Sequence, residues 1–188
     1  MPAPATDWTA ERVRELIDEE RHWPRYEVID GELLVTPAPS PVHQRAVALL
    51  FALLHPYVER TRIGHTFTSP ADIELSPKTM VQPDVFVVPP FAGPTPRSWK
   101  EVERLLLAAE VISPSSAWSD RTKKRPLFQR YTVPEYWIVD VDSRIVERWR
   151  PGDDRPEVLR TAVTWQPSDE HEPLEIDLAA YFAEVTGE

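Results

Sequence analysis

The feature that most constrains the fold is an apolar run from Leu105 to Ile112, interrupted by one carboxylate, Glu110. Serine and proline follow the run directly, as is typical of a segment that ends in a loop. Because polar and apolar residues do not alternate in it, the segment is expected to be buried on both faces. We therefore predict a central strand over 105–112, in a sheet that is buried on both faces. Glu110 would be a buried charge near the end of this strand.

Length and composition narrow the possibilities further. A chain of 188 residues has the size of one ordinary domain, so we expect a single domain over residues 1–188. The absence of cysteine excludes a disulfide scaffold, a thiolate zinc site and a cysteine nucleophile. The sequence has no apolar run near the roughly 20 residues that cross a bilayer and no apolar N-terminal segment, which predicts a cytoplasmic protein without a membrane partner.

Turn and helix-start signals define the other elements. Asp30-Gly31 predicts a tight hairpin over 26–36, because this pair accepts positive φ angles. Ser40 followed by Pro41 predicts a helix start, with its apolar face formed by Val42, Ala46, Leu49, Leu50, Leu53, Leu54 and Tyr57. The remaining pattern predicts helices over 7–20, 122–131 and 178–185, strands over 66–70, 72–75, 85–88, 136–140 and 145–149, and a weaker strand over 158–165.

Two carboxylates stand where these apolar strands begin or end. Asp84 precedes the strand over 85–88, and Glu110 lies near the end of the following strand. If the two strands pair antiparallel, both carboxylates meet at one edge of the sheet. Enclosed charges are costly unless they are paired or bind a metal, so their meeting indicates a divalent cation site for Mg²⁺ or Mn²⁺. From spacing alone, each carboxylate is equally consistent with a simple hydrogen bond to a loop.

An ordered set of motifs adds to this interpretation. The motifs are Tyr26 to Leu33, Ser40-Pro41, His43, Pro83-Asp84, Glu110 to Ser115, Asp120 with Lys124, and Val133 to Asp140. In this order they resemble the bacterial Uma-type family of predicted restriction endonucleases in the PD-(D/E)XK nuclease superfamily. The likeness covers roughly residues 26–150.

The resemblance implies an α/β fold of the restriction-endonuclease type, in which helices flank a mixed sheet and a β-hairpin comes first. It also implies hydrolysis of DNA phosphodiester bonds with Mg²⁺ (or Mn²⁺) as cofactor. Asp84 and Glu110 would be the metal ligands, and the backbone carbonyl of Val111 would complete the metal shell. Two carboxylates holding a cation satisfy the chemistry, because phosphodiester hydrolysis needs charge neutralisation and an activated water.

The superfamily's lysine usually follows the glutamate by two residues, where this chain has Ile112. The resemblance implies Lys124 as its replacement, since the Uma-type pattern carries an aspartate and, four residues later, a lysine. Pro126 predicts that the helix begins near Thr122, which would place Lys124 in the first turn, at the positive end of the helix dipole. The neighbouring Lys123 is expected on a solvated basic face instead, as is Arg130.

Three further residues are secondary candidates. His43, at a helix start, is equally consistent with a base or phosphate contact and with an ordinary surface residue. Glu32 follows the hairpin turn, and a glutamate from this part of the fold binds a second metal in some related nucleases. Asp120 either pairs with Lys124 or simply lies in the loop before the helix.

Three functions therefore compete. The first is a metal-dependent DNA endonuclease, and the second is an inactive module of the same fold that binds nucleic acid or protein. The third is a nuclease that acts on RNA. The net charge of −10 mildly favours the second and third, since it reduces attraction to duplex DNA. A homodimer is also expected, because one small domain reaches only one strand of a duplex.

Overall fold

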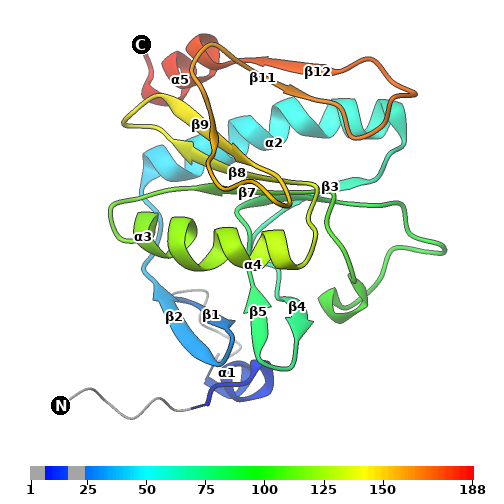
Figure 1. Cartoon of the computed structure of the whole chain (residues 1–188), viewed down its shortest axis with the longest axis vertical. Helices are drawn as coiled ribbons and strands as arrows, with labels where there is room; N and C mark the ends of the chain where they lie inside the picture. The colour runs from blue at the N-terminus through cyan, green and yellow to red at the C-terminus, as the bar shows by residue number, and fades with distance from the viewer. Residues whose placement is uncertain (1–6, 17–23) are drawn as a thin grey trace.

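The computed structural model describes residues 7–16 and 24–188. A six-stranded sheet, in the order β10-β9-β8-β7-β6-β3, forms its centre (Figure 1). Neighbouring strands pair antiparallel except β7 and β8, which are parallel. The strands are β3 (His65–Thr68), β6 (Val85–Val88), β7 (Leu107–Val111), β8 (Glu135–Asp140), β9 (Ile145–Trp149) and β10 (Glu157–Leu159).

Both faces of this sheet are buried, as the uninterrupted apolar strands require. Side chains on one face, including Ala109 and Trp137, pack under helices α2 (Pro41–Thr61) and α5 (Leu178–Thr186) and the strand pair β11 (Ala162–Trp165) and β12 (Leu174–Asp177). Side chains on the other face, including Ala108 and Tyr136, pack against α4 (Arg125–Arg130). β7 is thus the central, doubly covered strand that the apolar run predicts.

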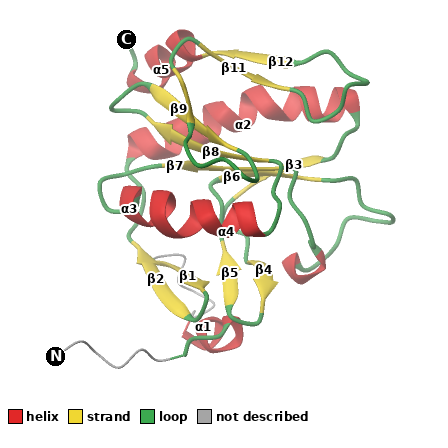
Figure 2. Ribbon diagram, in the orientation of Figure 1, coloured by secondary structure: helices red, strands yellow, loops and turns green. Residues whose placement is uncertain are grey.

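A second, four-stranded sheet in the order β2-β1-β5-β4 lies beyond α4 (Figure 2). Its strands are β1 (Arg25–Ile29), β2 (Glu32–Thr36), β4 (Ile73–Ser76) and β5 (Thr79–Val81). Val28 and Met80 pack on α1 (Ala10–Leu16), whereas Ile29 faces α4. The helical segment from α3 (Ala117–Ser119) to α4 therefore lies between the two sheets.

The β1–β2 hairpin confirms the turn prediction, with φ angles of 51° at Asp30 and 85° at Gly31. The mixed sheet, its flanking helices and this hairpin confirm the predicted fold class. The helix beginning at Pro41 is also confirmed, since the Ser40 side chain caps it. Within it, Val42 and Leu53 are 46% and 40% exposed, contrary to prediction, because they lie at the end and the margin of the buried stripe.

Several other boundaries differ from the sequence predictions. Of the helix over 7–20, the structure has 10–16, and 17–20 lie outside the described residues. β5 and β12 were not predicted, and the single strand over 158–165 is two strands with a break between them. A short 3₁₀ helix (Trp99–Glu101) lies in the proline-rich connection before β7. β5 and β12 have three and four residues, and periodicity is a weak signal over so short a length.

Candidate active site

Asp84 and Glu110 meet because β6 and β7 pair antiparallel. Val85 stands opposite Ala109, so the same register brings Asp84 opposite Glu110. Oδ2 of Asp84 accepts a hydrogen bond from the backbone N–H of Val111 at 2.9 Å, which ties the two strands together. Both carboxylates are enclosed, with exposed fractions of 3% and 2%. The convergence expected from the sequence is thus present.

Two basic side chains hold Asp84 from the other side. Nη1 of Arg25, on β1, donates to Oδ1 at 2.9 Å, and Nε2 of His43 lies 3.1 Å from Oδ2. Burial alone raises the pKa of Asp84, but the hydrogen bond with His43 and the charge of Arg25 outweigh it and lower the pKa below the ordinary 3.8. Asp84 is therefore held as a carboxylate.

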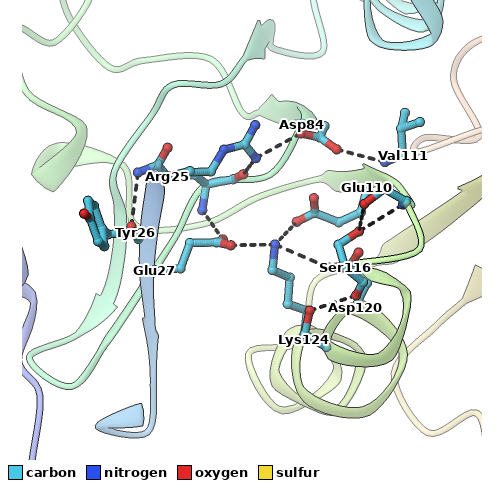
Figure 3. Close-up of polar contacts among 12 residues, drawn as sticks. Arg25, Tyr26, Glu27, Asp84, Glu110, Val111, Ser116, Asp120 and Lys124 are labelled. Atoms are coloured by element: carbon cyan, nitrogen blue, oxygen red, sulfur yellow. Dashed lines mark hydrogen bonds and ion pairs between the residues drawn. The ribbon is translucent and has the colours of Figure 1, made fainter. Parts of the chain in front are cut away.

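Lys124 enters the site from the helical segment and contacts three carboxylates (Figure 3). Its Nζ lies 2.8 Å from Oε2 of Glu27, 2.9 Å from Oε1 of Glu110 and 3.4 Å from Oδ1 of Asp120. All four side chains are buried. The structure thus brings the ammonium to the glutamate of β7, where the superfamily pattern requires a lysine.

A π-helical turn over Asp120–Lys124 gives Lys124 this position. The segment is helical from Ala117 onward, so the prediction of a start near Thr122, with Lys124 in the first turn, is wrong. Pro126 is tolerated inside it because the π turn moves the hydrogen bonds: the N–H of Arg125 donates to Asp120 O, and the Arg125 side chain donates to the carbonyl of Arg121. Such turns are frequent at functional sites.

Arg25, Glu27, His43, Asp84, Glu110, Asp120 and Lys124 form one cluster of buried and partly buried ionisable side chains, in which carboxylates outnumber cations. Among the residues that the structure describes, two permanent cations, Arg25 and Lys124, pair with the four carboxylates of Glu27, Asp84, Glu110 and Asp120. Burial raises the pKa of Glu110 well above its ordinary 4.5; the charge of Lys124 opposes this rise, and the other three carboxylates add to it. Burial lowers the pKa of Lys124, but Glu110, Glu27 and Asp120 raise it well above 10.5. The cluster therefore has an excess of negative charge that a cation can neutralise.

The structure separates the secondary candidates. His43 and Asp120 lie in the cluster, but Glu32 does not: its side chain is 63% exposed and pairs with Lys123 on the outer side of the helix. Lys123 itself is 16% exposed and therefore less solvated than predicted, because it lies over the Trp118 ring. Arg130 is exposed and pairs with Asp30, as a solvated basic residue should.

Two residues of the cluster, Arg25 and Glu27, were not among the sequence candidates. They alternate with Tyr26 along β1, on the face that also carries Ile29. The available signal was a glutamate in a segment that alternates like a half-buried strand. From sequence alone, such a glutamate cannot be told from one that faces solvent, because the element that packs on the strand is unknown. Gln82 fixes Glu27, since its backbone N–H donates to Oε1 at 2.7 Å.

Ile112 occupies the usual lysine position and packs at the margin of the core between the two sheets. It is two residues beyond Glu110, so the two side chains share one side of the extended chain. An apolar side chain there is compatible with the packing around α4, while the ammonium arrives from Lys124 instead.

A cavity of about 210 Å³ opens above the cluster. Residues 36–40 and 113–116 wall it, and Asp84, Glu110, Val111 and Lys124 line it. In the described part of the chain, no three His, Asp or Glu side chains form a metal site by themselves. The residues still fit Mg²⁺, which is commonly held by one or two carboxylates together with waters and substrate phosphate. The excess of carboxylate charge in the cluster also supports this fit.

Residues 10–180 match the Uma2 family, which is described as "putative restriction endonuclease". The chain belongs to the Uma2 family. This confirms the resemblance of the motifs. The chain is also similar to a solved structure from Anabaena variabilis ATCC 29413, described as a "putative nuclease belonging to DUF820". That structure has a TM-score of 0.73 at 18% identity, and the match covers 95% of this chain and 99% of the other.

The structural likeness establishes the fold, and Uma2 membership supports a nuclease. No curated protein matches the chain in sequence. Among the helices of the described residues, none combines the length and apolar character needed to cross a membrane.

Proposed function

We propose that this Uma2 protein is a divalent-metal-dependent endonuclease that hydrolyses DNA phosphodiester bonds. One observation carries the proposal: a buried lysine contacts the glutamate of one strand, and an aspartate faces that glutamate from the antiparallel neighbour, at the bottom of an open cavity. Two carboxylates and one ammonium on rigid elements match the requirements of phosphodiester hydrolysis. Asp84, Glu110 and Lys124 are the proposed catalytic residues.

Asp84, Glu110 and the carbonyl of Val111 would hold the cation, Mg²⁺ or Mn²⁺. When bound, it would supply positive charge to the scissile phosphate and lower the pKa of the attacking water. Arg25 and His43 keep Asp84 ionised and oriented for this task. The Val111 N–H does the same from the neighbouring strand.

Lys124 supplies a fixed positive charge beside Glu110. Its ammonium can donate a hydrogen bond to the attacking water or to a phosphate oxygen, which places charge where the transition state becomes more negative. Glu27 and Asp120 are positioning residues, because they hold the ammonium from β1 and from the same helical turn. Buried in this way, the ammonium loses little freedom when substrate binds.

The sequence left two alternative functions open, an inert binding module and an RNA nuclease, and the experiment below distinguishes them. An inert module has no need for a lysine enclosed by three carboxylates, an arrangement that is expensive to bury. We also propose a homodimer for cleavage of both strands of a duplex. Light scattering that shows a monomer with and without a DNA duplex would contradict the dimer and favour a nicking or single-strand activity.

The decisive experiment incubates the full chain with supercoiled plasmid, single-stranded DNA and RNA, in Mg²⁺, in Mn²⁺ and in EDTA. We expect nicked or linear DNA in the presence of either metal and none in EDTA. Lys124→Ala should abolish most of this activity, and Lys123→Ala should preserve it. Cleavage of RNA alone would assign the third function, and binding without cleavage of any substrate would assign the second.

A further inference from the structure

A second cavity continues from the first along helix α2. Its volume is about 330 Å³, and it opens to solvent beside the first turns of that helix. The two cavities share part of their lining, at the point where His43 contacts Asp84. The shared residues are Arg25, Pro39, His43 and Asp84. The two cavities therefore adjoin, so a polymer with one phosphate at the carboxylates has its next group beside the second cavity.

The second cavity differs in character from the first. Its α2 wall begins with His43 and Gln44 and continues with an apolar part, formed by Val47, Ala48 and Phe51, on the same side of the helix. The Phe51 ring is held in place, since it stacks on His55 with centroids 5.0 Å apart and planes at 12°. Thr68 and Ser69 form the opposite, polar wall. An apolar wall with a fixed ring, facing a polar one, suits a flat aromatic heterocycle with polar edges.

The charges of the site indicate that contacts with a heterocycle, more than contacts with phosphates, supply the binding energy. Among the residues that line the two cavities, the basic side chains are Arg25, His43 and Lys124, and all three already contact carboxylates of the cluster. The chain as a whole carries a net charge of −10. Proteins that hold nucleic acid chiefly through phosphates neutralise many of them with lysine and arginine, which these two cavities do not offer.

We propose that the second cavity binds the base of an unpaired nucleotide next to the scissile phosphate. This inference rests on the proposed function and specifies its substrate as single-stranded or locally unpaired nucleic acid. A supercoiled plasmid, or a duplex held by the proposed homodimer, would then be cut where its strands are unpaired. A base within a duplex has both faces stacked and its edge paired, so it cannot enter a cavity unless it leaves the helix. In the cavity, Val47 and Phe51 contact the face of the base, and Gln44 reaches its edge.

The test fills the cavity from the helix surface and measures binding without cleavage. Ala48 is exposed and lines the cavity, so Ala48→Trp occupies it without disturbing the core. Ala52 is exposed one turn later and outside the cavity, which makes Ala52→Trp the matched control. Binding is followed by fluorescence anisotropy in Ca²⁺, with a labelled DNA strand of about ten nucleotides, its duplex, and strands that carry one abasic nucleotide at each position in turn.

We expect the wild-type protein to bind the single strand more tightly than the duplex. One abasic position should weaken this binding by about tenfold, the scale of one lost base contact. Ala48→Trp should cause a similar loss, and the same abasic position should then cause no further loss, because both changes remove one interaction. Ala52→Trp should bind as the wild type does.

The opposite outcomes are equally definite. Tighter binding of the duplex, equal binding of all abasic strands, or additive losses in Ala48→Trp would each overturn the inference. Cleavage assays separate it from the proposed function. If the protein cuts DNA but binds every abasic strand as tightly as the intact strand, the proposed function stands and the base-binding subsite is refuted. If the abasic position and Ala48→Trp weaken binding non-additively but the protein never cuts in Mg²⁺ or Mn²⁺, the subsite stands and the proposed function is refuted.

Discussion

The ammonium of Lys124 lies 2.9 Å from Oε1 of Glu110, and neither side chain is more than 4% exposed. One residue belongs to a strand and the other to a π-helical turn that packs across it. The helix thus brings the positive charge beside the glutamate in a chain whose strand carries Ile112 at the usual lysine position.

Lys124→Ala should lower the cleavage rate by about 10²-fold, because one preorganised charge near the transition state is lost. It should also lower the free energy of unfolding by about 3 kcal/mol, since three buried carboxylates lose their cation. Lys123→Ala should change the rate little, because that side chain points to Glu32. Single-turnover cleavage and urea unfolding measure the two effects. Equal losses of rate and DNA binding in both variants would instead indicate a phosphate-binding face.

The double variant Ile112→Lys with Lys124→Ala should recover part of the lost activity. Position 112 lies on the same side of the extended chain as Glu110, so a lysine there can return the ammonium to the strand. Recovery should be incomplete, because Glu27 and Asp120 hold the ammonium of Lys124 and not a group at position 112. Cleavage rates of the single and double variants, compared at equal folded fraction, decide the matter. A double variant no more active than Lys124→Ala would argue against exchange of position.

Asp84→Asn and Glu110→Gln should each abolish binding of Mn²⁺ as measured by calorimetry. Each change preserves the shape of the side chain and removes one of the two carboxylates proposed as metal ligands, both of which line the cavity. Glu32→Gln is the control and should bind Mn²⁺ normally, since Glu32 lies outside the cluster. An unchanged affinity for Mn²⁺ in both Asp84→Asn and Glu110→Gln would refute the assignment of the metal ligands.

Glu27→Gln should reduce kcat about tenfold, the size typical of residues that orient a functional group. The change keeps an acceptor for the Gln82 N–H but removes the charge that holds Lys124. KM should stay nearly constant, because Glu27 does not line either cavity. Glu27→Asp should restore part of kcat, whereas a purely structural role would lower the melting temperature and leave kcat of the folded protein unchanged.

The stability of the metal-free protein should depend on pH through Glu110. Because the folded state raises the pKa of Glu110 well above 4.5, it binds this proton more tightly than the unfolded state. The resulting stabilisation is complete below 4.5 and is lost as the pH rises through the folded-state pKa. In EDTA, wild type should therefore lose stability relative to Glu110→Gln as the pH rises from 4.5 through the folded-state pKa of Glu110. Urea unfolding of both variants checks this, and a pH-independent difference would contradict it.

Asp84 shifts in the opposite direction and does not confuse this comparison. Its lowered pKa adds stability above pH 3.8, which is lost only as the pH falls through the folded-state pKa. Its partners Arg25 and His43 are present in both proteins, so this contribution largely cancels in the difference. Mn²⁺ at saturating concentration should abolish the pH dependence of the difference if Glu110 is a ligand, because a bound cation keeps its carboxylate ionised.

Local chemistry was enough to predict several elements. Asp30-Gly31 determines the hairpin turn because few other pairs accept two positive φ angles. Ser40 and Pro41 determine the start of α2, since one caps the first turn and the other cannot donate a backbone hydrogen bond. The apolar run of β7 determines that both faces of the sheet are covered. Each of these signals acts within a few residues, so sequence alone reveals it.

Only the tertiary structure decided the partners of the charges. The sequence by itself determined that Asp84 and Glu110 stand at strand ends, and the antiparallel register then placed them opposite each other. It did not determine that Glu27 reaches Lys124, because that contact joins a strand of the four-stranded sheet to a helical turn far away in the sequence. Nor did it reveal the π turn that delivers Lys124. Apart from Asp120 of its own turn, Lys124 is held by Glu27 and Glu110, which come from the two sheets. Long-range packing decides these partners, since a buried charge must be paired and the two sheets supply the carboxylates.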